Sequence, residues 1–254
     1  MLLVADIGNT STTLGVYKGL KLIFTWRIAS ENRRSADEYG ILIKNLLGNA
    51  DLSNKITGVI ISSVVLPLTD VFKQAIYKYL GIEVIILSAK IKTGLKFNVE
   101  NPKEVGADRI ANAYAAYKLY GKDIAVVDFG TATTFDIVSK KGEFLGGIIT
   151  PGPGIAAQSL NSFTSLLPKV NLEVPKTVVG KNTIDSMLSG LIRGHASMID
   201  GMIDAVEQEL GLKVLTIATG GYSKMLTDCL KRPFDIESPY LTLEGLRLIY
   251  EINK

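Results

Sequence analysis

The sequence predicts an α/β protein built from two similar lobes, each with a mixed sheet flanked by helices. A motif repeats: DIGNTSTT, from Asp6 to Thr13, returns half a chain later as DFGTATT, from Asp128 to Thr134. Each copy follows an apolar run, enters another and reaches a third strand-like segment. After the first copy, strand-like and helical segments alternate. Repetition of a whole supersecondary unit predicts a duplicated architecture.

Three strands are expected around each copy of the motif, because apolar residues precede the polar turn, follow it and continue after a second turn. An Asp-x-Gly turn after a strand also occurs in ordinary hairpins, so one copy alone would leave that alternative open. The expected strands are residues 2–5, 14–17 and 21–29 in the first half, and 124–127, 135–138 and 143–150 in the second.

The rest of the first half is expected to alternate between helices and strands. Ser35, with Glu38 three residues later, has the pattern of a capping box and predicts a helix over residues 35–47. This alternation favours a mostly parallel sheet covered by helices. Further elements are expected as a strand at 58–65, a helix at 67–79, a strand at 83–87 and a long helical stretch at 102–120 that joins the halves.

The second half continues with predicted helices at 155–167 and 186–210, a strand at 214–218 and a helix at 222–230. Gly220 and Gly221 stand just before the last of these helices. A flat base or a phosphate could rest on such a bare helix start, but a turn that only saves space has the same sequence. His195, the single histidine, is expected to be a helix residue and not a catalyst.

Length and composition agree with two lobes, which we place at residues 1–117 and 118–254. Hydrophobic residues make up 47% of the chain and charged residues 21%, as in globular proteins with a sizeable core. A net charge of +3 with scattered basic residues argues against nucleic-acid binding. The single Cys229 excludes an intramolecular disulfide, the apolar runs are too short to span a membrane, and a cytoplasmic location is expected.

The repeated motif has the chemistry of a phosphate-binding loop. Glycine lets the backbone approach a ligand, and neighbouring hydroxyl and amide groups supply donors for phosphate oxygens. The aspartate can hold a cation or its water. Two facing loops of this kind could hold one nucleotide phosphate chain. No Gly-x-x-x-x-Gly-Lys-Ser/Thr run exists, which disfavours a P-loop kinase.

Asp108 and Arg109 form a second candidate group, beside Gly106 at the start of the predicted helix. In one interpretation Asp108 stabilises the helix N-terminus and Arg109 is its surface partner. In the other, Asp108 orients a substrate hydroxyl for attack on a phosphoryl group, and Arg109 binds substrate or stabilises developing charge. An ordinary aspartate has a pKa of about 4, so it would orient the alcohol more than deprotonate it.

Five motifs in order, DIGNT, GADR, DFGTATT, GGIITPG and TGG, resemble those of type III pantothenate kinases over essentially the whole chain. The resemblance implies a duplicated actin-like, ribonuclease H-like fold. It also implies ATP-dependent phosphorylation of pantothenate to 4′-phosphopantothenate, the first step of coenzyme A biosynthesis. Mg²⁺ would accompany ATP, and the family also uses a monovalent cation, K⁺ or NH₄⁺.

The resemblance also assigns roles to individual residues. Asp108 would accept the proton, Asp128 would be a ligand of the monovalent cation, and Thr183 would reach the substrate from the other subunit of a homodimer. Thr183 would serve equally well as a helix cap. The ATP site would comprise Asp6, Ile7, Gly8, Asn9, Thr10, Ser11, Thr12, Thr13 and Thr131. The pantothenate site would comprise Gly106, Ala107, Asp108, Arg109 and Thr183.

The chain departs from the family pattern at one position. Many members carry a tyrosine that packs on the substrate two residues before the Asn-Pro pair, where this chain has Val99, with Phe97 the nearest aromatic. Two other functions stay open: a kinase of the same superfamily with another substrate, and a non-enzymatic regulator. The presence of Asp6, Asp108 and Asp128 disfavours the regulator.

Overall fold

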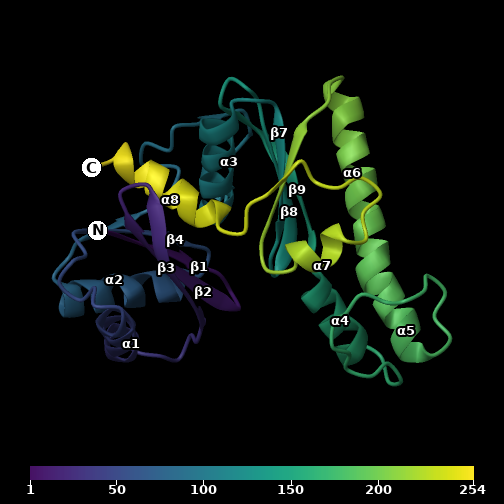
Figure 1. Cartoon of the computed structure of the whole chain (residues 1–254), viewed down its shortest axis with the longest axis horizontal. Coiled ribbons are helices and arrows are strands. Elements are labelled where there is room, and N and C mark those ends of the chain that lie inside the picture. Colours follow the sequence, from purple (N-terminus) through teal and green to yellow (C-terminus); the bar gives the residue numbers. More distant parts are fainter. The chain divides into compact units, whose positions relative to one another are not determined.

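The computed structural model describes residues 1–254, and the chain forms two compact units, described separately below. The first unit comprises Met1–Lys118 and Leu241–Lys254, and the second comprises Leu119–Tyr240. The expected second lobe ran on to residue 254, whereas in the structure the C-terminal helix packs in the first unit (Figure 1). No helix combines the length and apolarity needed to cross a membrane.

The first unit contains a mixed sheet with the strand order β3-β2-β1-β4-β5. Strands β1, β2 and β3 pair antiparallel in sequence, whereas β4 and β5 add parallel to β1. The strands of this sheet are β1 (Leu2–Ile7), β2 (Ser11–Lys18), β3 (Lys21–Ala29), β4 (Gly58–Ser63) and β5 (Val84–Ile86). The short strand β6 (Lys96–Phe97) follows β5 in the chain and is not part of this sheet. Every strand predicted for this half is present, with bounds shifted by a few residues.

Helices α1 and α2 cover one face of this sheet. Tyr39 of α1 and Phe72 of α2 are buried with the inward residues of β1 and β4 in one core. The capping box at Ser35 and Glu38 is confirmed, since each side chain bonds the other residue's backbone N–H. The helices of this unit are α1 (Ala36–Asn49), α2 (Leu66–Leu80), the 3₁₀ turn η1 (Pro102–Glu104), α3 (Ala107–Tyr120) and α8 (Leu241–Glu251).

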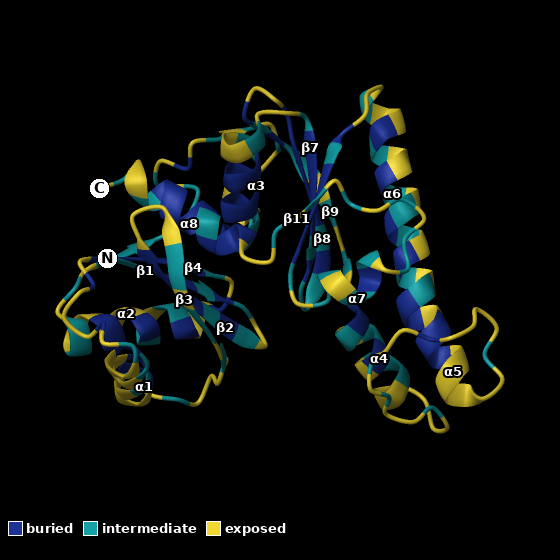
Figure 2. Ribbon diagram, viewed as in Figure 1, coloured by how far each residue is buried: buried dark blue, intermediate teal, exposed yellow.

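Helix α8, which sequence analysis did not predict, packs on β1, β2, β4 and α3 through close contacts at glycines. A Cβ on Gly245 would lie 2.0 Å from the backbone oxygen of Ala111, and one on Gly15 would lie 2.8 Å from Leu243 Cδ1. Gly58 makes a similar space for the ring of Tyr250. The helix therefore closes the second face of the first sheet at short range, as its largely buried residues show (Figure 2).

The sheet of the second unit repeats the arrangement of the first. Its strands run in the order β11-β10-β7-β8-β9, with β7, β8 and β9 antiparallel in sequence and β10 parallel to β7. Both three-stranded meanders carry a register shift near the end of the middle strand, at Val16/Tyr17 and at Ile137/Val138. The strands are β7 (Ile124–Phe129), β8 (Ala132–Val138), β9 (Glu143–Pro151), β10 (Leu215–Thr219) and β11 (Ile236–Glu237). The predicted duplication is confirmed.

The helices of the second unit differ in length from the predicted ones. The helix predicted at 186–210 begins earlier and contains a π-helical stretch, so it is divided into α5 (Thr183–Leu188), η2 (Ser189–Gly194) and α6 (His195–Leu210). The buried side of α6 carries Ile199 and Ile203, and its other side is exposed (Figure 2). Helices α4 (Pro153–Ser162) and α7 (Ser223–Thr227) both end earlier than predicted.

Candidate active site

The first copy of the motif forms a tight loop between β1 and β2. The N–H of Gly8 donates to the carbonyl of Ser11 at 3.1 Å, and Ile7 pairs with Thr12 across the loop. A Cβ on Gly8 would lie 3.1 Å from that same carbonyl oxygen, so the turn is fitted to glycine. The turn from Gly8 to Thr10 therefore lies at the carboxyl end of β1, with the polar residues Asn9 and Thr10 exposed.

The segment after β3 braces this loop. The N–H of Ser30 donates to the carbonyl of Thr10 at 3.1 Å, and the hydroxyls of Ser30 and buried Thr12 lie 2.9 Å apart. The hydroxyl of Tyr39 accepts from the N–H of Glu31 at 2.8 Å and so links the segment after β3 to α1. The loop is consequently held by hydrogen bonds from outside its own hairpin.

Asp6 lies in a polar row across the sheet, on the face opposite the α1 and α2 core. It pairs with Thr13 on β2 and with Ser62 on β4, and directly paired residues share a face. Ser62 is fully buried, and its Oγ has no hydrogen-bond partner. The row therefore presents a carboxylate between two hydroxyls at the end of β1.

Asp108 lies near the DIGNT loop, in the same unit. It lies in the first turn of α3, where its Oδ1 accepts from the N–H of Arg109 at 2.8 Å. A Cβ on Gly106 would lie 2.6 Å from that oxygen and 3.6 Å from Val64, whose N–H donates to the carbonyl of Ile7 at 3.1 Å. The structure thus brings the GADR motif to the end of β1, where the DIGNT loop begins.

Loss of water around the carboxyl of Asp108 raises its pKa above the ordinary value, against the opposing effects of the Arg109 N–H and guanidinium. This carboxylate is therefore a better proton acceptor than the ordinary aspartate expected from the sequence. Asp108 also lies in the first turn of α3, where a carboxylate stabilises the helix N-terminus, so this interpretation agrees with the structure.

The second copy of the motif makes a loop one residue shorter, with Phe129 paired to Thr133. The N–H of Gly130 donates to the carbonyl of Ala132 at 3.1 Å, and the N–H of Gly152 donates to the carbonyl of Thr131 at the same distance. A Cβ on Gly152 would lie 2.6 Å from the Thr131 oxygen. The turn between β9 and α4 is therefore pressed against this loop.

Gly220 packs against Asp128. Its φ is +91°, and a Cβ there would lie 2.4 Å from Asp128 Oδ1 and 2.6 Å from the N atom of Phe129. The N–H of Tyr222 donates to the carbonyl of Phe129 at 3.1 Å. The close packing of Gly220 on Asp128 agrees with a turn that saves space. A base or phosphate resting on this turn stays a prediction.

Thr133 of the second loop is held by a hydrogen bond from outside its hairpin, as Thr12 is in the first loop. Thr133 is fully buried, and its Oγ1 lies 2.9 Å from His195 Nε2 at the start of α6. His195 directly follows the π-helical stretch η2, a feature common beside functional sites. Burial lowers the pKa of His195, which keeps the ring neutral near pH 7. His195 lies in a helix, as expected, but no sequence pattern indicates its contact with Thr133, because the two residues are far apart in the chain.

A cavity of about 700 Å³ lies beside Tyr222, which follows the Gly220-Gly221 turn. Tyr222 and Met225 line it together with polar residues of α4 and of the following loop. The polar residues are Gln158, Asn161, Ser162, Lys169 and Asn171. No sequence pattern indicated the cavity, apart from the Gly-Gly pair that precedes Tyr222.

Thr183 is exposed at the first position of α5 and does not cap that helix. The cap is Asn182, whose side chain accepts from the N–H of Asp185 at 2.9 Å. The helix-cap interpretation of Thr183 was therefore wrong, and its hydroxyl is not used for capping.

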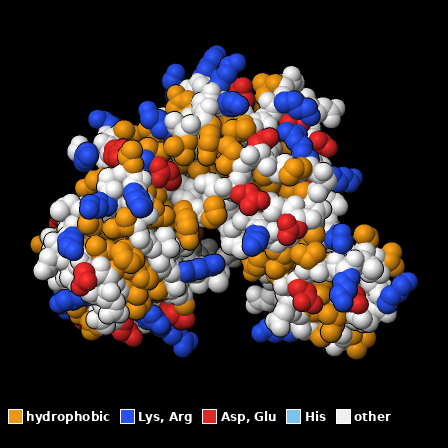
Figure 3. All heavy atoms as spheres, viewed as in Figure 1, with side chains coloured by type: hydrophobic (Ala, Val, Ile, Leu, Met, Phe, Trp, Pro, Cys, Tyr) orange, Lys and Arg blue, Asp and Glu red, His pale blue; other side chains and the backbone are white.

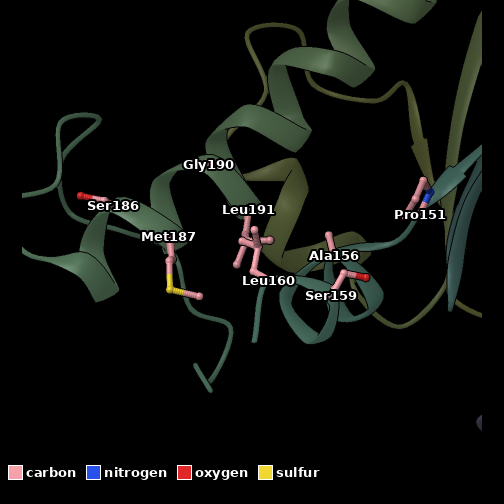
Figure 4. A pocket seen from close by; sticks show the side chains of 8 residues that line it. All are labelled: Pro151, Ala156, Ser159, Leu160, Ser186, Met187, Gly190 and Leu191. Atoms are coloured by element: carbon pink, nitrogen blue, oxygen red, sulfur yellow. The ribbon is translucent and has the colours of Figure 1, made fainter. Parts of the chain in front are cut away.

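Next to α5 is an open groove of about 480 Å³. Ser186, Met187 and Leu191 line it on the α5 and η2 side (Figure 4). Ala156, Ser159 and Leu160 line it on the α4 side, and Pro151 and Gly190 complete it (Figure 4). The groove is mainly apolar.

Comparison with known proteins identifies the family. The type III pantothenate kinase family matches residues 2–205. A type III pantothenate kinase of Moorella thermoacetica is 44% identical over 257 aligned residues, which cover 100% of both chains.

Solved structures support the fold. A putative Baf family transcriptional activator from Campylobacter jejuni superposes with a TM-score of 0.61 at 22% identity, over 99% of this chain and 98% of its own. A putative 2-dehydro-3-deoxygalactonokinase from Sinorhizobium meliloti also gives 0.61, at 12% identity and 99% coverage of both chains. The two mixed sheets flanked by helices thus have the actin-like fold shared with sugar kinases, as predicted. The chain belongs to the type III pantothenate kinases, which transfer phosphate from ATP to an alcohol group of pantothenate in the first step of coenzyme A biosynthesis.

Proposed function

We propose that Asp108 accepts a hydrogen bond from the primary hydroxyl of pantothenate and orients it toward the γ-phosphoryl group of ATP. The observation that carries this assignment is the desolvated carboxylate of Asp108 beside the end of β1. Its raised pKa makes it a stronger acceptor, although an alcohol still has a far higher pKa. Asp108 therefore positions the nucleophile and takes the proton as the O–P bond forms.

Gly106, Ala107 and Arg109 would line the pantothenate site around this carboxylate. The absence of a Cβ at Gly106 leaves space next to Asp108 Oδ1. Arg109 supplies a positive charge for the substrate or for charge that develops during transfer. Val99 or Phe97 would take the place of the packing tyrosine and shape the pocket around the substrate.

The ATP phosphates would bind to donors of Asp6 to Thr13 and to Thr131. The braces on Thr12 and on Thr133 support this proposal, because preorganised donors cost little reordering when a ligand binds. The hydroxyl row at Asp6 suits a water-coordinated Mg²⁺, which takes oxygen ligands. The cavity at Tyr222 would receive the nucleoside part of ATP.

Asp128 would provide one oxygen ligand for a monovalent cation, K⁺ or NH₄⁺. The close packing of Gly220 on Asp128 Oδ1 supports this proposal, because it holds the carboxylate in one position. A carboxylate oxygen is a hard donor, which suits such a cation. When bound, the cation would offset negative charge of the phosphates.

A homodimer would complete the substrate site through Thr183 of the partner subunit. Large apolar side chains are exposed on the α4 and α5 end of the second unit (Figure 3). They flank the apolar groove described above, so a second copy of this chain is the occupant we propose. Exposed members are Ile155 (39%), Phe163 (87%), Leu166 (89%), Val178 (67%), Val179 (67%) and Ile184 (49%). A cytoplasmic location would give such an enzyme access to ATP.

The catalytic proposal is tested by phosphorylation of pantothenate with Mg-ATP, with K⁺ or Na⁺ as the single monovalent cation. We expect 4′-phosphopantothenate in K⁺ and little in Na⁺. Asp108→Asn should abolish most turnover but retain ATP binding, whereas Asp70→Asn, an exposed carboxylate on α2, should behave as wild type. Normal turnover by Asp108→Asn would remove Asp108 from this role, and equal rates in K⁺ and Na⁺ would remove the cation from Asp128.

The dimer is tested by sedimentation of Phe163→Glu against Leu20→Glu. Both residues are strongly exposed, at 87% and 76%, but only Phe163 lies at the end of α4 beside the groove. We expect Phe163→Glu to weaken association by about tenfold or more and to raise the KM for pantothenate. A monomeric wild type with full activity would contradict the proposal.

A further inference from the structure

Arg27 lies at the edge of the polar row that contains Asp6. On β3 it pairs with Thr13, which in turn pairs with Asp6 on β1. Because directly paired residues share a face, Arg27 stands on the same face of the sheet as that carboxylate. The row therefore ends in a positive charge next to the first phosphate loop.

The side chain of Arg27 reaches into that loop. Its Nε donates to the hydroxyl of Ser11 at 2.9 Å. This contact orients the planar guanidinium from one side and leaves its two terminal amino groups without a hydrogen bond. Arg27 is exposed and takes part in none of the ion pairs of the structure. Its charge is therefore not neutralised by a carboxylate of the protein.

The second sheet has no counterpart of this charge. In the equivalent row Asp128 pairs with Thr134, and Thr134 pairs with Ile149, an exposed apolar residue. The duplicated architecture therefore does not need an arginine at this position. Since the second hairpin forms without this charge, the arginine points to a ligand and not to the stability of the hairpin.

We propose that Arg27 binds the terminal phosphates of ATP through its two terminal amino groups. The proposal rests on the assignment of Asp6 to Thr13 to the ATP phosphates. A guanidinium presents parallel N–H donors that match two phosphate oxygens, and its charge stabilises the phosphoryl group during transfer. Ser11 acts as a positioning residue, because its hydroxyl holds Nε and aims the remaining donors. This chain has no P-loop lysine, and Arg27 supplies the positive charge that such a lysine provides to the phosphates of ATP.

The test compares Arg27→Met and Arg27→Lys with Arg33→Met, which removes the same charge from another exposed position. We expect Arg27→Met to raise the KM for ATP by about tenfold or more and to lower kcat, with the KM for pantothenate within about twofold. Arg27→Lys should recover part of the loss, since it restores charge but not the two parallel donors. Arg33→Met should match wild type, because exposed charges at longer range are screened.

Binding of ATP, ADP and AMP gives a second readout. Arg27→Met should weaken ATP and ADP and leave AMP unchanged, because AMP lacks the terminal phosphates. Ser11→Ala should weaken ATP binding by a smaller factor than Arg27→Met, and by less in the Arg27→Met background than in the wild type. Equal effects of Arg27→Met and Arg33→Met, or equal weakening of all three nucleotides, would overturn the proposal.

A loop variant separates this proposal from the assignment on which it rests. Gly8→Val should lose ATP binding, because a side chain there meets the Ser11 carbonyl. If Gly8→Val binds ATP normally, the first loop is not the phosphate site. If Gly8→Val loses ATP and Arg27→Met does not, the loop assignment stands and the role of Arg27 is wrong.

Discussion

At the scale of single residues, opposing effects act on the carboxyl of Asp108. Burial raises its pKa, whereas the N–H and charge of Arg109 lower it, and burial is the larger effect. The folded chain therefore keeps the proton to a higher pH than the unfolded chain, whose value is 3.8. Once Asp108 is deprotonated, the folded state holds a charge that burial disfavours. The free energy of unfolding therefore falls as the pH rises from 3.8 through the higher pKa of the folded state.

We predict that Asp108→Asn lowers turnover by a factor of about 10²–10⁴ and makes the protein more stable at pH 7. The variant loses the catalytic acceptor together with the cost of the buried charge. Urea unfolding at pH 7 and pH 4.5, beside steady-state kinetics, checks both parts. The gain in stability should shrink at the lower pH, and a variant less stable than wild type at pH 7 would contradict this account.

His195 gives a stability effect in a different pH range. Burial lowers its pKa below 6.5, so the unfolded chain binds the proton more readily than the folded chain. Stability contributed by neutral His195 is therefore complete above pH 6.5 and falls as the pH drops below that value.

We predict that His195→Gln, which keeps a polar group near Thr133, removes this part of the pH dependence. Wild type should lose free energy of unfolding between pH 7.5 and pH 5.5, and the variant should lose less. Chemical unfolding at matched ionic strength measures both slopes. Identical slopes would mean that His195 does not titrate in this range.

At the scale of elements, the turn between β10 and α7 shapes the second loop through Gly220. Gly211, the C-cap of α6, also has a positive φ, +66°, but nothing lies within 4 Å of where its Cβ would be. An alanine at either position pays the left-handed backbone cost of about 1–2 kcal/mol. Only at Gly220 does it also meet Asp128 and the backbone of Phe129.

We predict that Gly220→Ala costs more stability than Gly211→Ala and abolishes activation by K⁺. The new methyl group displaces the Asp128 carboxylate, whereas the Gly211 variant leaves the loop intact. Thermal unfolding together with rates at increasing KCl concentration measures the two effects. If both variants keep the K⁺ response of wild type, Asp128 is not the cation ligand.

Strands were the elements most open to prediction from sequence. Apolar runs on both sides of DIGNTSTT and DFGTATT located six strands, because each run is bounded by turn residues. The capping box at Ser35 located the start of α1 for a similar local reason. Helix α8 was missed, since Gly245 in its centre is a poor helix residue whose value lies in packing on Ala111.

At the scale of the whole molecule, the last segment of the chain completes the first unit. Gly245 of α8 touches the backbone of α3, while Gly201 in α6 is an exposed helix glycine with nothing near it. The same substitution should therefore have opposite effects at the two positions.

We predict that Gly245→Ala destabilises the protein by several kcal/mol, and that Gly201→Ala stabilises it by up to about 1 kcal/mol. A Cβ at Gly245 would lie 2.0 Å from a backbone oxygen that cannot rotate away, so α8 must shift. Urea unfolding of both variants gives the comparison. A Gly245 variant as stable as wild type would show that α8 is not tightly docked.

The sequence by itself determined the repeated Asp-x-Gly motif, the GADR group and the family, because each can be recognised in short runs of adjacent residues. Tertiary structure decided what those residues contact: Gly220 at Asp128, His195 at Thr133, Arg27 at Ser11 and Gly106 beside Val64. These partners are separated along the chain and meet only through sheet register and helix packing, and the raised pKa of Asp108 comes from the burial that this packing produces.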